Sequence, residues 1–295
     1  MSPEQVPLID FRIRPPYESF VPSFFTLGYP LDEGLGLPAI VRLCFRDPVA
    51  SRDEKSFDLF LEEMDEAGVV FAVVTGRAGV DNTDVAELVS RYPERFAGFG
   101  GVDTSDVETA LREIGLFREL GFAGVALDNG MASPARHNDD PALRPIYELC
   151  RDEGLLVSLN GSFLLSPDLS FIDPVRIQRV ALEFPDLRII VAHGCWPWVT
   201  QVCAVALMCP NVYVMPDLYP HMPEQEGFFE AVRAGLEGQL LYGSSYPAMS
   251  LPASARVIRS VDFSPARGAL REMFESAAAL LGRDPHELAP KYERD

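Results

Sequence analysis

Eight short apolar runs, spread along most of the chain, are the feature that most restricts its fold. Most of these runs are continuous rather than alternating, which is typical of parallel strands that are covered by helices. Several have a glycine directly before or after them. The predicted strands are Pro7–Ile13, Val69–Thr75, Phe96–Val102, Phe122–Leu127, Leu155–Leu159, Arg188–Ala192, Asn211–Met215 and Gln239–Tyr242.

Amphipathic helical patterns fill the gaps between these runs. The last predicted helix is expected to end at Gly282, because glycine readily adopts the left-handed conformation that follows many helices. The predicted helices are Asp53–Ala67, Val107–Leu120, Pro141–Glu153, Pro174–Phe184, Trp198–Met208, Gly227–Leu236, Pro252–Ser260 and Arg267–Leu281.

Regular alternation of strand and helix predicts the α/β class and a TIM barrel. The alternation repeats about eight times, which is the pattern of a (β/α)₈ barrel. We therefore expect one barrel domain over residues 1–295. An open, doubly wound sheet is the structural alternative, but no Gly-x-Gly-x-x-Gly turn follows an early strand to favour it.

A long connection over residues 15–52, rich in proline and aromatic residues, follows the first predicted strand. Long loops in compact domains often carry function or act as lids, and in a barrel this loop would lie on the catalytic face. A packed excursion or a contact between subunits is an equal alternative. A homodimer is therefore a further expectation for this segment.

Charge and cysteine content restrict the partners and the compartment. The formal net charge is −19, which argues against nucleic acid or an anionic membrane as a partner. The five cysteines include no Cys-x-x-Cys pair, which predicts reduced thiols in a cytoplasmic protein. The N-terminal residues lack the basic and apolar segments of a signal peptide, and no apolar run is long enough to span a bilayer.

Asp10, Arg12 and Arg14 occupy alternate positions of the first predicted strand. Alternate side chains of a strand point to one face, so a barrel would place two permanent cations at its mouth. A guanidinium can bind a carboxylate or phosphate through two parallel hydrogen bonds. The other interpretation is an internal ion pair with Asp10, Asp128 or Asp217, because an unpaired guanidinium in a dry interior is costly.

Five further motifs have an order and spacing that, together with this first strand, resemble the amidohydrolase superfamily. The resemblance is to its amidohydrolase-related branch of decarboxylases and hydrolases, in which the first strand reads Asp-x-His-x-His. The further motifs are Gly-Val-Ala-Leu-Asp at 124–128, Asp-Pro-Ala-Leu-Arg-Pro-Ile-Tyr-Glu at 140–148, Ile-Ile-Val-Ala-His-Gly at 189–194, Gly-Ser-Ser-Tyr-Pro at 243–247 and Ala-Ala-Ala-Leu-Leu-Gly at 277–282.

The departures from this family pattern concern its metal ligands. Arg12 and Arg14 stand where the resemblance implies two metal-binding histidines, Asn160 where it implies a third and Ser245 where it implies an aspartate. A further ligand position implied by the resemblance is the histidine after the sixth strand, and there the chain keeps the family's residue as His193. A catalytic zinc site needs about three protein ligands, which one histidine cannot supply. The sequence therefore predicts no metal and no other cofactor.

The same strand ends supply the candidate site residues. His193 is predicted to transfer protons near neutral pH, the alternative being a structural residue held by backbone hydrogen bonds. Asp217 is expected to act as a second acid or base, or to pair with an arginine. Asn160 and Ser245 are predicted to orient the substrate by hydrogen bonds. An alternative that keeps a metal would use His193, Asp217 and His221.

Together these residues predict a metal-independent enzyme of the superfamily that acts on a small, carboxylate-bearing compound. Arg12 and Arg14 would bind its anionic group and stabilise negative charge in the transition state. Hydrolysis is the favoured reaction because it is prevalent in the family, and decarboxylation or another C–C lyase reaction is less favoured. The competing hypothesis is a non-catalytic anion-binding or regulatory barrel that has lost its ancestral metal site.

Overall fold

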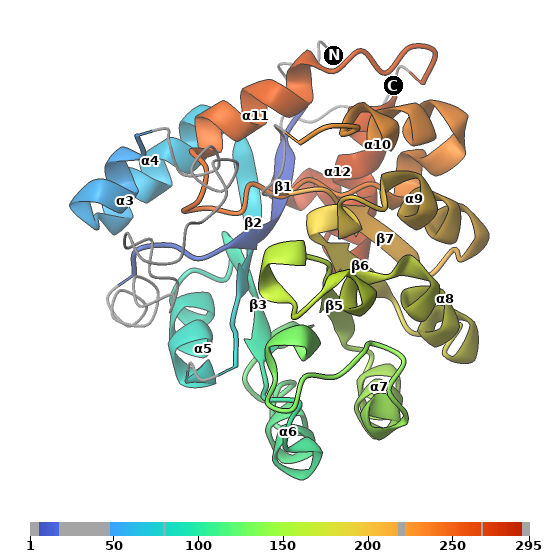
Figure 1. Ribbon diagram of the computed structural model, residues 1–295. Coiled ribbons are helices and arrows are strands. Elements are labelled where there is room, and N and C mark those ends of the chain that lie inside the picture. The colour runs from blue at the N-terminus through green and yellow to red at the C-terminus, as the bar shows by residue number, and fades with distance from the viewer. Residues whose placement is uncertain (1–5, 18–47, 79–80, 218–221, 267, 291–295) are drawn as a thin grey trace, which may run out of the picture.

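Seven parallel strands follow one another in sequence order around a barrel in the computed structural model, with helices on the outside (Figure 1). The structure describes residues 6–17, 48–78, 81–217, 222–266 and 268–290. The strands are β1 (Leu8–Ile13), β2 (Val69–Thr75), β3 (Phe96–Gly101), β4 (Phe122–Leu127), β5 (Leu156–Asn160), β6 (Ile189–Ala192) and β7 (Val212–Met215).

Residues 240–246, which we call the closing segment, occupy the position of an eighth strand. Leu241 N–H donates to the Val214 carbonyl at 2.9 Å, and Phe11 N–H donates to the Tyr242 carbonyl at 2.9 Å. Only isolated bridges join this segment to β7 and β1, so the predicted strand Gln239–Tyr242 is not a regular strand. The TIM barrel itself is confirmed, because these bonds link β7 to β1.

Helices fill the connections between strands, as predicted, although several bounds differ; the predicted helix Val107–Leu120, for example, ends at Ile114. The predicted helix Asp53–Ala67 is interrupted at Lys55, which has a left-handed φ of 53°, and the helix from Asn82 to Arg91 was not predicted. The α-helices are α3 (Ala50–Glu54), α4 (Phe57–Ala67), α5 (Asn82–Arg91), α6 (Val107–Ile114), α7 (Arg144–Asp152), α8 (Pro174–Glu183), α9 (Val199–Met208), α10 (Glu226–Ala231), α11 (Leu251–Ser260), α12 (Ala269–Leu280) and α13 (Pro285–Leu288).

Several shorter helical turns complete the connections. Gly282 follows α12 with a φ of 63°, as its predicted role at the end of this helix requires. The short turns are η2 (Asn129–Met131), η3 (Pro141–Leu143), η4 (Phe163–Leu165), η5 (Leu169–Ile172), η6 (His193–Cys195), η7 (Val232–Leu236) and η8 (Glu237–Gln239).

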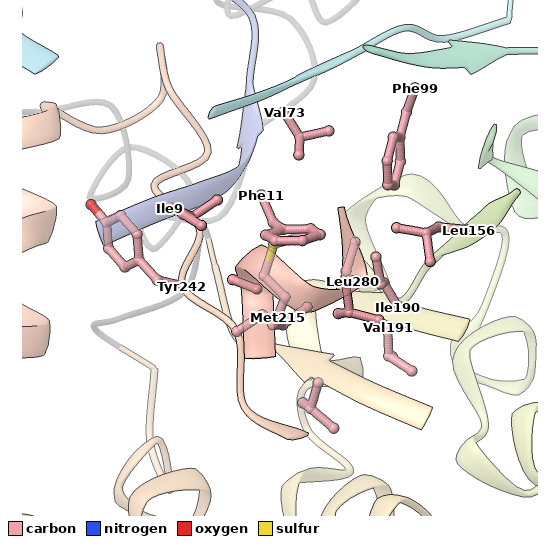
Figure 2. Close-up of a cluster of buried hydrophobic side chains, with 14 of the residues drawn as sticks. Ile9, Phe11, Val73, Phe99, Leu156, Ile190, Val191, Met215, Tyr242 and Leu280 are labelled. Carbon is pink, nitrogen blue, oxygen red and sulfur yellow. The ribbon is translucent and has the colours of Figure 1, made fainter. Parts of the chain in front are cut away.

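Apolar side chains from different strands fill the barrel, so it is a packed core rather than a pore. Phe11 on β1 and Phe99 on β3 pack edge to face, with ring centroids 6.4 Å apart. Figure 2 shows Leu156 and Ile190 in the same buried cluster. Because the interior is filled in this way, polar chemistry is confined to the strand ends, where TIM-barrel active sites lie at the carboxyl end.

Two expectations, on the long connection and on membrane-spanning segments, can be compared with the structure only over the described residues. Residues 18–47 of the long connection lie outside the described residues, so its role as a lid or as a subunit contact stays a prediction. Among the described residues, no helix combines the length and apolar character that crossing a membrane requires.

Candidate functional site

The carboxyl ends of the parallel strands bring most of the predicted site residues to one end of the barrel. The charged groups there are close enough to shift one another's pKa values. The residues are Arg12 and Arg14 on β1, Arg77 after β2, Asp128 after β4, Asn160 at the end of β5, His193 after β6, Asp217 after β7 and Ser245 in the closing segment.

Arg12 and Asp217 form a buried ion pair in this cluster. Arg12 Nε lies 3.6 Å from Asp217 Oδ2, and the side chains are 6% and 0% exposed. This is one of the two outcomes considered for the arginines from sequence: the guanidinium has an internal carboxylate partner. Because both side chains are buried, removing either partner would leave the other as an uncompensated charge.

Asp217, which follows β7, also binds the two chain segments that lie on either side of that strand. Its Oδ1 accepts a hydrogen bond from the His193 backbone N–H at 2.7 Å, and its Oδ2 accepts one from the Ser245 hydroxyl. Burial raises the pKa of Asp217, but His193, Arg12 and the Ser245 hydroxyl outweigh this and lower it to about 2. Asp217 is therefore a carboxylate at neutral pH that organises three segments.

His193 lies where β6 ends in an unusual turn. Its φ is 64°, a left-handed conformation that is uncommon for a residue other than glycine, and Gly194 follows with a φ of 61°. An added Cβ at Gly194 would lie 2.6 Å from the Phe228 ring, so a larger residue does not fit. This turn places the His193 backbone N–H and its ring against the same carboxylate of Asp217.

The ring of His193 is 2% exposed, and its Nδ1 lies 3.2 Å from Asp217 Oδ1. Burial lowers the pKa of His193 and Arg12 adds to this, while Asp217 offsets part of the effect. At neutral pH the ring is therefore uncharged. We assign the proton to Nδ1 because that atom faces a carboxylate, which leaves the lone pair on Nε2.

Arg14 is held differently from Arg12. Its Nε donates to the Thr75 carbonyl at 3.0 Å and its Nη2 to the Gly76 carbonyl at 3.5 Å, both at the end of β2. Burial and the neighbouring Arg12 lower its pKa to about 9, so Arg14 is still a cation at neutral pH. Within the described chain, its Nη1 has no hydrogen-bond partner.

Asn160 and Asp128 form a pair on the other side of the cluster. Asn160 Nδ2 donates to Asp128 Oδ1 at 2.6 Å, and Asn160 Oδ1 accepts from the Ser162 backbone N–H at 2.8 Å. Burial would raise the pKa of Asp128, but the charges of Arg12 and Arg14 lower it overall. Asn160 is therefore anchored at both polar ends, and its predicted contact with a substrate stays a prediction.

Asp10 lies below the strand end and is completely buried. Its Oδ1 accepts hydrogen bonds from the backbone N–H groups of Arg12 and Ser244, each at 3.0 Å. The pairing of β1 with β2 shifts register between Asp10 and Ile13, so the strict alternation assumed from sequence does not hold there. Asp10 therefore binds backbone groups rather than either guanidinium.

Arg77 belongs to this cluster but was not singled out from the sequence. The ends of β2 and β3 approach closely at this point, since a Cβ at Gly101 would lie 2.2 Å from the Arg77 backbone nitrogen. Arg77 contributes to the electrostatic shifts of both Arg14 and Asp128. Its position two residues after the end of a predicted strand was the available signal, because residues there line the catalytic face of a barrel.

Among the described residues of the cluster, three arginines stand against two ionised aspartates and Asp10, whose pKa of about 7 leaves it partly protonated at neutral pH, so positive charge is in excess. The arginines are Arg12, Arg14 and Arg77, and the aspartates are Asp128 and Asp217. An excess cation in a largely buried site attracts an anion.

Cys195, which lies two residues after His193, is not suited to act as a nucleophile. Burial raises the pKa of its thiol, and the thiolate is the reactive form.

Comparison with known proteins identifies the family. The amidohydrolase family model matches residues 26–283. This chain belongs to the amidohydrolase family. An uncharacterized TIM-barrel protein from Bordetella bronchiseptica is 30% identical, with a TM-score of 0.83 over 94% of this chain and 99% of that one.

Two further proteins to which this amidohydrolase chain is similar are decarboxylases by name. A 2-amino-3-carboxymuconate-6-semialdehyde decarboxylase from Dictyostelium discoideum is 31% identical over 88 residues, which are 30% of this chain and 24% of that protein. The match thus spans about a quarter of that relative's length. A 5-carboxyvanillate decarboxylase from Novosphingobium aromaticivorans, solved with manganese and a nitrobenzoic acid, is 16% identical, with a TM-score of 0.65 over 95% and 97% of the chains.

The residues of the present site do not fit a divalent metal. At the two β1 positions the amidohydrolase chain has guanidiniums, which offer no lone pair. Asp217 already binds Arg12, His193 and Ser245. Over the described ranges, no group of three or more His, Cys, Asp or Glu residues is arranged to hold a metal ion. His221, which the alternative metal site would use, lies outside those ranges.

Proposed function

We propose that this amidohydrolase-family protein is a metal-independent decarboxylase of small carboxylic acids. The observation that carries the proposal is that Arg12 and Arg14 have different partners. Arg12 faces Asp217 at 3.6 Å, whereas Arg14 is anchored by backbone carbonyls and keeps Nη1 for another partner. The two named relatives described above are decarboxylases, which supports decarboxylation over the hydrolysis favoured from sequence.

Arg14 is the group we assign to the anionic part of the substrate. A guanidinium binds a carboxylate through charge-assisted hydrogen bonds, and the excess positive charge of the cluster favours such a ligand. The anion held by Arg14 is not the carboxylate that leaves, because a tight ion pair on that group would stabilise the ground state. The substrate therefore carries a second acidic or oxygen-centred anionic group beside the carboxylate that is lost.

His193 is the group we assign to proton transfer. In decarboxylation the C–C bond to the carboxylate breaks, its electron pair stays on the product carbon and CO₂ leaves. One proton must then reach that carbon. His193 can take up a proton at Nε2 and deliver it, while Asp217 at Nδ1 fixes the orientation of the ring. Its buried position lowers the pKa of the imidazolium and makes it a stronger acid.

Hydrolysis is the second candidate, and one observation favours it. A neutral His193 whose Nδ1 faces the carboxylate of Asp217 is suited to act as a general base toward water. The two reactions use the same residues and differ in the bond that breaks. They are distinguished by their products, since only decarboxylation releases CO₂.

A substrate screen with product analysis tests the proposal. Protein treated with a chelator is incubated with aromatic and unsaturated mono- and dicarboxylates, and CO₂ and the organic products are measured by mass spectrometry. We expect CO₂ release that survives chelation, is lost in His193→Asn and is retained in Glu108→Gln, a control at an exposed helical position. Hydrolytic products would select the second candidate. Turnover that returns only when manganese or zinc is added would refute metal independence, and no turnover would favour the binding protein.

A further inference from the structure

Asp10 and Asp217 both bind β1 and the closing segment, Asp10 through backbone groups and Asp217 through side chains. Asp10 Oδ1 accepts from the backbone N–H groups of Arg12 and Ser244, each at 3.0 Å. Asp217 binds the side chain of Arg12 and the hydroxyl of Ser245, which directly follows Ser244. One carboxyl group therefore fixes the backbones, and the other binds the side chains that those backbones carry.

This double attachment lies at the seam where the barrel closes. Arg12 belongs to β1 and Ser244 to the closing segment, which lacks a regular ladder to β1. Ser245 has a left-handed φ of 55°, so its backbone conformation needs support from its neighbours. The Asp10 carboxyl supplies bonds to both sides of the seam at the point where regular strand pairing is missing.

The Asp10 carboxyl group has no contact with solvent, so its pKa depends on the groups around it. It is 0% exposed, and its Oδ2 has no hydrogen-bond partner among the residues that the structure describes. The titratable and charged groups that face it are Asp217 after β7 and Tyr242 in the closing segment, and Arg259 of α11 in turn faces Tyr242. Burial raises the pKa of Asp10 to about 7, with Asp217 adding to the shift and the bonds from Ser244 and Arg12 opposing it.

We propose that Asp10 is a positioning residue of this site: its carboxyl group fixes the backbones of Arg12 and Ser244 and thereby sets how closely Arg12 and Ser245 approach Asp217. The proposal does not depend on which reaction the protein catalyses. It concerns the arrangement of Asp217, which His193 also contacts. The pKa of the His193 ring therefore responds to changes at Asp10 through Asp217, without direct contact between His193 and Asp10.

The test follows the titration of His193 by NMR in three proteins. In Asp10→Ala both backbone bonds are lost, Arg12 and Ser245 withdraw from Asp217, and the less neutralised carboxylate raises the pKa of His193. In Asp10→Asn the amide oxygen can still accept both bonds, so the His193 titration returns toward that of the wild type. An exposed control, Asp65→Asn, is expected to leave it unchanged.

Two results would overturn the proposal. One is a His193 titration that Asp10→Ala leaves at its wild-type midpoint. The other is an Asp10→Asn variant whose shift equals that of Asp10→Ala, because the backbone bonds would then be irrelevant. If Asp10→Ala does not fold, the wild type decides: the amide protons of Arg12 and Ser244 must shift together, with one common midpoint, when the Asp10 carboxyl group titrates. Separate midpoints for the two amides would equally contradict the proposal.

Discussion

Arg12 and Asp217 form an ion pair between the first strand and the end of the seventh, and both side chains are almost completely buried. The cation that faces Asp217 is a side chain of the protein itself. The carboxylate of Asp217 is therefore neutralised without any external partner, which is the physical basis for the metal-independent reaction that we propose.

Replacing Arg12 by methionine tests the energetic importance of this pair. Arg12→Met leaves Asp217 buried without its guanidinium, and breaking a buried pair in this way costs about 3–5 kcal/mol. Urea denaturation at pH 7 measures the loss. The control is Arg112→Met, because Arg112 pairs with Glu108 on the surface and such pairs contribute about 0–1 kcal/mol. Equal losses of unfolding free energy in the two variants would show that the buried pair stabilises the protein no more than a surface pair does.

Asp217 should give the protein a characteristic sensitivity to acid. Its pKa is lowered from 3.8 to about 2 on folding, so the unfolded chain binds a proton more readily than the folded one. The stabilisation is therefore complete above about pH 4 and is lost as the pH falls through about 2. We expect Asp217→Asn to be less stable than the wild type at pH 7, and the gap to narrow as the pH falls from 4 to 2. A gap that stays constant with pH would show that Asp217 is not ionised in the folded protein.

The sequence predicted the barrel well because its strand signals are local. Continuous apolar runs identified β2 and β4 with their observed bounds, and the ends of the other regular strands lie within one residue of those expected. The closing segment was less predictable, since its apolar run Gln239–Tyr242 is followed by the left-handed turn at Ser245. The unpredicted α5 had readable signals: Asp81 caps its first turn, and Val85 and Leu88 lie one helical turn apart.

The pairing inside the site could not be derived from the sequence. The strand-end rule was enough to expect Arg12, His193 and Asp217 at one end of the barrel. It did not decide which arginine meets Asp217, because that choice depends on the register shift in β1 and on the turn after Ala192. The contacts of Arg14 with the carbonyls of β2 are tertiary for the same reason.

Gly101 is predicted to be intolerant of any side chain. An added Cβ would lie 2.2 Å from the backbone of Arg77, and backbone atoms cannot rotate away as a side chain can. We expect Gly101→Ala to lower the free energy of unfolding by about 1–3 kcal/mol, which is typical of overpacking. Gly268→Ala is the matched control, since a Cβ there meets no atom within 4 Å. Thermal denaturation of both variants measures the difference, and equal melting temperatures would contradict the close approach of β2 and β3.

Asp10 should make stability fall as the pH rises from about 4 to about 7. Its pKa is raised from 3.8 to about 7 in the folded protein, so the folded state keeps a proton that the unfolded chain loses. The contribution to stability is therefore full below about pH 4 and decreases as the pH rises to about 7. Chemical denaturation of the wild type and of Asp10→Asn at pH 5 and pH 8 measures it. We expect a larger decrease in the wild type, and an equal decrease in both proteins would assign the effect to another group.

Arg14 is expected to control the binding of anions. Arg14→Met removes the guanidinium that keeps Nη1 for a ligand, and a hydrogen bond to a charged group contributes about 1.5–3 kcal/mol. The Kd for a carboxylate such as benzoate, measured by NMR titration, should therefore rise roughly tenfold to a hundredfold. Arg151→Met, at an exposed position beside Asp152, controls for the change in net charge. Binding that is weakened equally in both variants would reflect the overall charge of the protein, and unchanged binding in Arg14→Met would place the anion elsewhere.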